Sequence, residues 1–190
     1  NPLNPIDILD IATGTADIAL ELSKIKDSKV TGLDISEKML DVGRQKVADR
    51  NLNDKVVLIS GDAENLNFSK NSFDLISIGF GVRNFQNLEK GISESFRVLR
   101  NGGTLIVLET SVPQNRFIKF FYLLFSRTFI PLVGYVFSKD KKAYRYLQKS
   151  AEEFPSGKKF SQILKSCGFN SVEILPLMLG ASSIYIAKKN

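Results

Sequence analysis

The sequence has no histidine and a single cysteine among its 190 residues. Without histidine it cannot build a Ser-His-Asp triad or a histidine metal site, and it lacks the commonest general base. One cysteine cannot form a disulfide framework or a thiolate metal cluster, and Cys167 lies in an apolar helical pattern that favours a core position over a nucleophile. We therefore expect no metal and a reducing, cytoplasmic environment.

The sequence also shows no recognisable targeting or membrane-spanning segment. No secretory signal peptide is visible, and the most apolar stretch is too short and too charged for a transmembrane helix. Hydrophobic residues make up 43% and charged residues 24%, which predicts one globular domain over residues 1–190. The net charge of +6 indicates an anionic partner, either nucleic acid or a membrane surface.

The stretch 6–17 predicts a buried strand, a tight loop of small residues and a helix that starts near Thr15. Small residues at every second position let a ligand approach the backbone closely: Ala12, Gly14 and Ala16. A second apolar run, 29–34, ends on Asp34, 20 residues after Gly14. This layout is typical of nucleotide-binding sites, in which the carboxylate binds the ribose hydroxyls.

Two further acids beside this loop indicate which nucleotide binds. Asp10 ends the first strand and Asp17 falls in the first helical turn, so together they would repel the pyrophosphate of NAD or FAD. S-adenosylmethionine fits the charge, because it carries a sulfonium and an ammonium group next to its ribose. Two structural alternatives stay open: Asp17 as a first-turn acid favoured by the helix dipole, and Asp10 as a structural acid.

Strands and helices alternate through the first 110 residues, which predicts a parallel, doubly wound α/β sheet. Further strands are expected at 56–59, 73–78 and 104–109, the last after a turn at 101–103, and helices at 37–51, capped by Ser36, and 87–99. The first two helices should bury one face each, formed by Ile18, Leu22 and Ile25 and by Met39, Leu40, Gly43 and Val47. A helix at 158–167, capped by Gly168, and strands at 171–176 and 182–188 follow, the strands as an antiparallel hairpin at the sheet edge.

Residues 117–146 interrupt this alternation. They hold 10 of the 19 aromatic residues and six basic residues against one acid, Asp140. We interpret this helical insert, about 114–153, as a lid over an apolar substrate or a surface that rests on lipid. An ordinary helical insert packed on the core is the alternative.

The chain resembles the class I S-adenosylmethionine-dependent methyltransferases, and within them the menaquinone and ubiquinone biosynthesis C-methyltransferases. The resemblance covers nearly all of the chain and rests on segments at 80–84, 97–103, 108–111, 138–140, 143–147, 153–155 and 180–185. It implies a Rossmann-like sheet of seven strands with an antiparallel last strand and a helical lid insert after strand five. The family's N-terminal segment, which carries tyrosine, asparagine, histidine and tryptophan, has no counterpart in this sequence, and we expect it to be absent.

The resemblance also implies roles for individual residues. The implied cofactor-binding residues are Asp10, Gly14, Thr15, Asp34, Ile35, Asp62, Ala63 and Gly79. Among them Thr15 belongs to the methionine-binding loop, Asp34 binds the ribose, and Asp62 and Ala63 bracket the adenine. Gly79 departs from the family, which often has serine there, and Ala16 replaces the last loop glycine.

The implied reaction is C-methylation of a reduced prenylated demethylquinone. Arg83 is the candidate that stabilises the phenolate, and Asn84 would orient the second ring oxygen. The alternative for Arg83 is a structural cap on the loop carbonyls. Phe80, Tyr144 and Arg145 are candidates for substrate binding.

Several alternatives for the substrate stay open. A menaquinone precursor is preferred over a ubiquinone precursor or another small apolar acceptor. A nucleic-acid methyltransferase is disfavoured, because 79–81 reads Gly-Phe-Gly where amine methylation needs an Asn/Asp-Pro-Pro-aromatic run. A non-catalytic cofactor-binding subunit is the last alternative. One option is that the protein makes peripheral contact with an anionic membrane surface, at the inner face of the membrane. The oligomeric state stays open, and a homodimer is one alternative.

Overall fold

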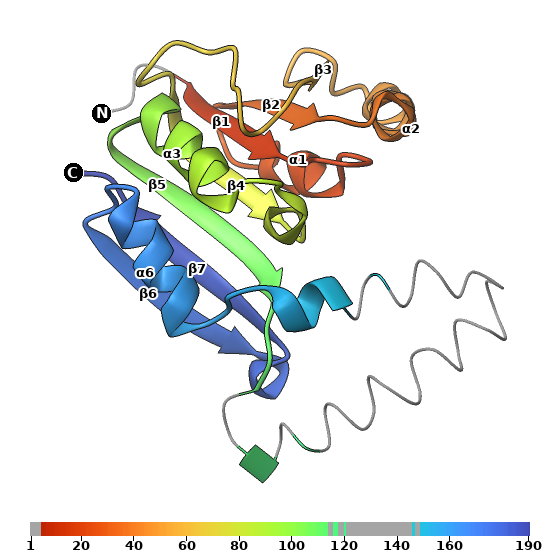
Figure 1. Cartoon of the computed structure of the whole chain (residues 1–190). Coiled ribbons are helices and arrows are strands. Elements are labelled where there is room, and N and C mark those ends of the chain that lie inside the picture. Colours follow the sequence, from red (N-terminus) through yellow and green to blue (C-terminus); the bar gives the residue numbers. More distant parts are fainter. Residues whose placement is uncertain (1–4, 114–115, 118–119, 121–145, 147–148) are drawn as a thin grey trace, which may run out of the picture.

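The computed structural model describes residues 5–113, 116–117, 120, 146 and 149–190 (Figure 1). Seven strands form one sheet in the order β3-β2-β1-β4-β5-β7-β6. Their bounds are β1 (Ile6–Ile11), β2 (Ser28–Asp34), β3 (Val56–Ser60), β4 (Phe73–Gly79), β5 (Leu99–Thr110), β6 (Ser171–Leu177) and β7 (Ser182–Lys188). The pairs from β3 to β5 are parallel, and β7 runs antiparallel to both of its neighbours. The predicted sheet, with its antiparallel last strand, is confirmed.

Helices cover both faces of this sheet. The α-helices whose bounds lie wholly within the described residues are α1 (Asp17–Leu22), α2 (Glu37–Asp49), α3 (Leu88–Val98) and α6 (Lys158–Ser166), and the 3-10 helices there are η1 (Val82–Asn84) and η2 (Met178–Gly180). Figure 1 shows α3 and α6 in front of the sheet, with α1 and α2 on the other side.

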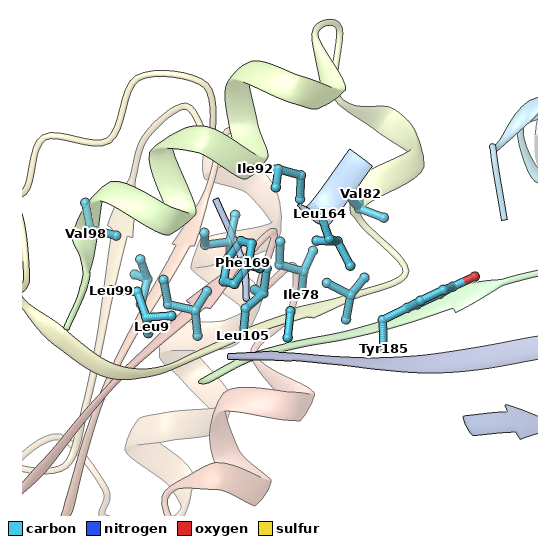
Figure 2. Close-up of a cluster of buried hydrophobic side chains, with 14 of the residues drawn as sticks. Leu9, Ile78, Val82, Ile92, Val98, Leu99, Leu105, Leu164, Phe169 and Tyr185 are labelled. Atoms are coloured by element: carbon cyan, nitrogen blue, oxygen red, sulfur yellow. The ribbon is translucent and has the colours of Figure 1, made fainter. Parts of the chain in front are cut away.

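The alternation of side chains along β1 explains why two cores form. Ile8 packs with residues of α1 and α2, whereas Leu9 and Ile11 join the larger cluster beneath α3 and α6. Figure 2 shows part of this larger cluster, from Leu9 to Tyr185. Both faces of β1 are therefore buried, and the carboxyl end of β1 lies at the middle of the sheet.

The first two helices differ in detail from the prediction. Ala16 adopts a left-handed conformation, so α1 starts at Asp17 and not at Thr15. The helix ends at Leu22, which leaves Ile25 exposed, and the expectation that Ile25 is buried was wrong. Met39 is also exposed, although the pattern placed it against the sheet, because it faces the loop at Gly14.

Strand β5 begins earlier than the predicted 104–109. The register against β4 shifts between the pairs Phe73–Leu99 and Leu75–Thr104, so the predicted turn at 101–103 is an irregularity inside the strand. Gly102 adopts a φ of 79°, which glycine tolerates. Lys189, which follows β7, joins the chain to the end of α3 and the start of β5, because its Nζ donates hydrogen bonds to the carbonyl oxygens of Phe96 and Leu99.

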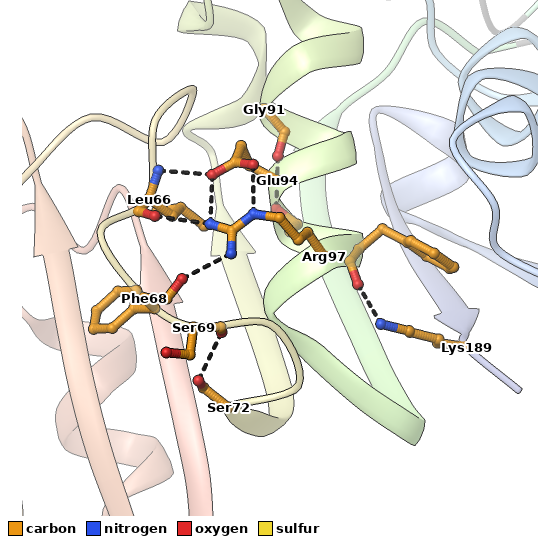
Figure 3. Close-up of polar contacts among 10 residues, drawn as sticks. Leu66, Phe68, Ser69, Ser72, Gly91, Glu94, Arg97 and Lys189 are labelled. Atoms are coloured by element: carbon orange, nitrogen blue, oxygen red, sulfur yellow. Dashed lines mark hydrogen bonds and ion pairs between the residues drawn. The ribbon is translucent and has the colours of Figure 1, made fainter.

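The segment between β3 and β4 is held by Arg97 of α3 (Figure 3). The guanidinium forms a two-pronged ion pair with Glu94 and donates to the carbonyl oxygens of Leu66 and Phe68. The backbone N–H of Leu66 in turn donates to Glu94. These bonds anchor the loop that carries residues 61–64 past the carboxyl end of β3.

Candidate active site

Two adjoining cavities lie at the carboxyl ends of the first strands. The first has a volume of 240 Å³ and lies between the ends of β2 and β3 and the segment after β4. The second has a volume of 540 Å³ and lies mainly between the ends of β1 and β4 and the start of α1. They share Ala12, Asp34, Gly81 and Asn84. Open α/β sheets bind ligands at this edge, where neighbouring crossovers leave on opposite faces.

Most of the predicted site residues line these cavities. The first is lined by Asp34, Ile35, Asp62, Ala63 and Asn84, and the second by Asp10, Gly14, Asp34, Gly79, Phe80 and Asn84. Within the described residues, neither Thr15 nor Arg83 is part of either lining. Tyr144, Arg145 and most of the predicted insert lie outside the described residues.

Asp34 fastens the loop after β1 to the end of β2. Its Oδ2 accepts a hydrogen bond from the backbone N–H of Gly14 at 2.8 Å, and its Oδ1 accepts one from the N–H of Ser36 at 2.8 Å. Each carboxylate oxygen keeps a further acceptor site, since an ionised carboxylate offers about four. A ligand with a vicinal diol therefore finds an acceptor here that is already oriented.

Two residues with unfavourable backbone conformations line the same cavities. Ala12 (φ 55°) and Phe80 (φ 55°) adopt left-handed conformations, which non-glycine residues seldom do. Each costs of order 1 kcal/mol or more, and such outliers gather at ligand sites. Both residues line the second cavity, so the strain shapes its wall.

Asp10 is a buried acid at the floor of the second cavity. Its side chain accepts hydrogen bonds from Thr13 Oγ1 at 2.6 Å and from Ser77 Oγ at 2.5 Å. The residue is 1% exposed, and this burial raises the pKa of Asp10 from 3.8 to about 6, although the two hydroxyls oppose the shift. Neither partner was predicted: Thr13 is only three residues away in the loop, whereas Ser77 is 67 residues away on β4.

Asp17 has a different environment. It is exposed and forms an ion pair with Lys46 of α2 at 2.8 Å, and it accepts a hydrogen bond from Thr15 Oγ1. Hydrogen bonds from Lys46 and Thr15 lower the pKa of Asp17. Its charge is thus largely balanced within the protein, and of the two acids beside the loop only Asp10 faces the cavity without a cationic partner among the described residues.

The first cavity combines an exposed apolar side chain with polar loop groups. Ile35 is 77% exposed and stands across from the loop after β3, where Asp62 Oδ1 accepts the N–H of Glu64. Glu64 itself accepts the N–H of Asn87 at 2.9 Å. A flat heterocycle can stack on Ile35 while its edge reaches the Asp62–Ala63 segment.

Steric limits explain the glycines at the end of β4. A Cβ on Gly79 would collide with Cδ1 of Ile18, and one on Gly81 with the Cβ of Ala12. The departure from serine at Gly79 is therefore matched by the bulk of Ile18, which fills the space a serine side chain would need.

Arg83 lies beside the second cavity in a buried ion pair. Its guanidinium contacts Glu109 Oε1 at 2.5 Å, and Glu109, near the end of β5, is fully buried. Glu109 also accepts the backbone N–H and the hydroxyl of Thr110. Arg83 Nε is buried and has no hydrogen-bond partner among the described residues. Glu109 was not among the predicted site residues, although an acid at the end of an otherwise apolar strand is a usable signal.

Asn84 connects the cavities to Tyr146. Its Oδ1 accepts a hydrogen bond from the hydroxyl of Tyr146 at 2.9 Å, and Asn84 lines both cavities. The structure thus brings a residue that follows β4 against one that precedes α6, next to the strained Phe80.

Comparisons with known proteins agree with this architecture. The model of the ubiE/COQ5 methyltransferase family matches residues 1–189. A protein of Bacteroides fragilis named demethylmenaquinone methyltransferase is 39% identical over 189 residues, 99% of this chain and 77% of that one. One of the same name from Chlorobaculum tepidum is 40% identical over 182 residues, which cover 96% of this chain and 73% of that one.

Solved structures show the same fold at lower sequence similarity. The crystal structure of a SAM-dependent methyltransferase from Aquifex aeolicus superimposes with a TM-score of 0.70 at 19% identity. The match covers 97% of this chain and 83% of that one.

Proposed function

Because the chain belongs to the ubiE/COQ5 methyltransferase family, we propose that it transfers a methyl group from S-adenosylmethionine to a ring carbon of reduced demethylmenaquinone. The assignment of the substrate is supported by the similarity of this chain to relatives that are named for that reaction. They are 39–40% identical to it over nearly its whole length. S-adenosylmethionine supplies an electrophilic methyl group on its sulfonium sulfur.

The described residues fit this cofactor by their chemistry. Asp34 would accept the ribose hydroxyls, and the Asp62–Ala63 segment would bind the adenine edge opposite Ile35. The ionised form of Asp10 would face the positive end of the molecule, beside the N–H groups and small side chains of the loop at 12–16. Thr15 would support this loop through its bonds to Asp17 and Lys46.

Arg83 and Asn84 would act on the quinol ring. When a ring hydroxyl loses its proton, the negative charge reaches the adjacent ring carbon. This carbon would form the new bond to the methyl carbon as the bond between the methyl carbon and sulfur breaks, and the sulfur would leave as a neutral thioether. That carbon afterwards loses its hydrogen as a proton, which restores the aromatic quinol. Arg83 would stabilise the phenolate through the positive charge of its guanidinium, which the ion pair with Glu109 holds beside the second cavity, and Asn84 would orient the second oxygen.

The test is an assay with two reduced substrates and a methyl-labelled cofactor. We expect demethylmenaquinol to gain the label on a ring carbon and a ubiquinone precursor to react much more slowly. Labelling of the benzoquinol alone would overturn the menaquinone assignment, and labelling of neither would overturn the reaction.

We also propose that the protein meets its substrate at an anionic membrane surface. The net charge of +6 and the exposed side chains of Met178 and Leu179 support this contact. Among the described residues, no helix is both long and apolar enough to cross a bilayer. Flotation with vesicles that contain anionic lipid should retain the protein at low salt and release it at high salt. Equal recovery with neutral vesicles would contradict the proposal.

A further inference from the structure

A third cavity lies at the other end of the sheet, beside the start of α6. It has a volume of 570 Å³ and is formed by residues that follow β5, by β6 and η2, and by the loop before α6. Among its described lining residues, none also lines the first or the second cavity. Its volume falls within the range of about 300–1,000 Å³ that is usual for small-molecule sites.

Strand register places this cavity next to the Arg83–Glu109 pair. Glu109 on β5 is directly opposite Ser183 on β7, and Ser183 lines the cavity. Directly opposed residues on antiparallel strands have their side chains on the same face, with Cβ atoms about 5 Å apart. The cavity therefore starts one cross-strand step from the ion pair that would act on the quinol ring.

The floor and walls favour an apolar occupant. Ser111 Oγ donates to the carbonyl of Gly180 at 2.7 Å and lies 3.0 Å from Ser183 Oγ, so these hydroxyls bond within the wall. The N–H of Gly157 donates to the hydroxyl of the fully buried Tyr185. The remaining wall includes four apolar side chains: Val112, Ile174, Pro176 and Leu179. Only Lys158 is charged among the described lining residues, and it is exposed.

Two large apolar residues stand exposed in η2, at the edge of the cavity. Met178 (φ 48°) and Leu179 (φ 58°) are 80% and 78% exposed, and both adopt left-handed conformations that bulky residues rarely have. An unfavourable backbone that presents apolar side chains to solvent is a feature of binding sites.

We propose that this cavity binds the isoprenoid tail of the quinol, while the ring lies at Arg83 and Asn84. The inference rests on the proposed substrate and adds to it the part of the protein that recognises the tail. Contacts to the tail would hold the ring in place and would lower KM for tailed substrates.

A filled cavity tests this assignment. Val112→Trp should lower kcat/KM for tailed demethylmenaquinol at least about tenfold, through KM, because several buried methylene contacts are lost. The same quinol without a tail should be methylated as by the unchanged protein. Val57→Trp on β3, at the opposite edge of the sheet, is the matched control and should change neither value. A loss that is equal for both quinols, or absent for both, would overturn the tail site.

A second variant covers the case in which tryptophan disturbs folding. Leu179→Asn removes an exposed apolar contact, and asparagine tolerates the left-handed backbone better than leucine. It should raise KM for the tailed quinol alone, and an unchanged KM would count against the site. If the unchanged protein methylates neither quinol, the proposed function fails. If it methylates both without discrimination by either variant, only the tail site fails.

Discussion

The two ends of the carboxyl edge of the sheet differ in the polarity of the residues that line their cavities. At β1 and β2 the cavities are lined by carboxylates and polar loop groups, and Asp34 accepts hydrogen bonds from two backbone N–H groups. At β5, β7 and β6 the third cavity is lined by apolar side chains and by hydroxyls that bond to one another. One edge can therefore receive a polar cofactor and an apolar substrate side by side, and the Arg83–Glu109 pair lies at the border.

The largest effect is expected at this border. Arg83→Ala should lower kcat roughly 10²–10³-fold and leave cofactor affinity unchanged, because a donor to the phenolate is lost. It should also destabilise the fold by about 3–5 kcal/mol, since Glu109 would remain buried without its partner. The double variant Arg83→Met/Glu109→Gln should recover most of the stability but not the turnover, as measured by thermal unfolding and by methyl transfer. Normal turnover in the double variant would show that the Arg83–Glu109 pair has only a structural role and would contradict the catalytic assignment of Arg83.

The next effect concerns the polar end alone. Asp34→Ala should weaken S-adenosylmethionine binding about a hundredfold, near 3 kcal/mol, because hydrogen bonds to a charged acceptor are lost. Asp41→Ala, on the exposed side of α2, is the control and should leave affinity as it is. Calorimetry can measure both, and an unaltered affinity for the Asp34 variant would contradict the assignment.

Asp10 should make cofactor binding depend on pH. Burial raises its pKa to about 6 in the free protein, so below pH 6 the residue is protonated, and a cationic ligand must displace that proton. Affinity should then fall as pH drops below 6, by up to about tenfold per unit. Asp10→Asn should remove this dependence, whereas Asp54→Asn, an exposed acid, should keep it. A flat profile for the unchanged protein would show that Asp10 does not face the cation.

The smallest effect is expected at the surface pair beside the loop. Lys46→Ala frees Asp17, and because both side chains are accessible, stability should change by at most about 1 kcal/mol. Cofactor affinity should shift by less than threefold, as measured by the same calorimetry. A larger gain in affinity would indicate that Asp17, once released, contacts the cofactor.

Local contacts were predictable from the sequence, and distant ones were not. The strand, small-residue loop and acid at Asp34 lie within one β-α-β unit, so their spacing predicted a shared nucleotide-binding layout. The structure brings Gly14 and Asp34 into direct contact. Arg83 and Glu109 are 26 residues apart, and Asn84 and Tyr146 are 62 apart. Their contacts depend on which strands become neighbours and on where α6 begins, and no local pattern encodes either.

Helix faces were only partly predictable for a related reason. The apolar spacing of α2 correctly indicated that Leu40, Gly43 and Val47 are buried, but it could not distinguish the sheet from the neighbouring loop for Met39. Similarly, the left-handed Ala16 delays α1, and a small residue in that conformation leaves no signature in hydrophobic periodicity.

The position of β7 has a consequence for how the molecule is made. This strand is the last of the seven to leave the ribosome, yet it lies between β5 and β6 and pairs with both. The unit from β3 to β4 can assemble during translation, but β5 must then wait with one edge unpaired, and β6 has no neighbouring strand until β7 arrives. The free edge of β5 and both edges of β6 are therefore the surfaces that nascent chains expose longest, and a chaperone or a neighbouring chain would pair with them there.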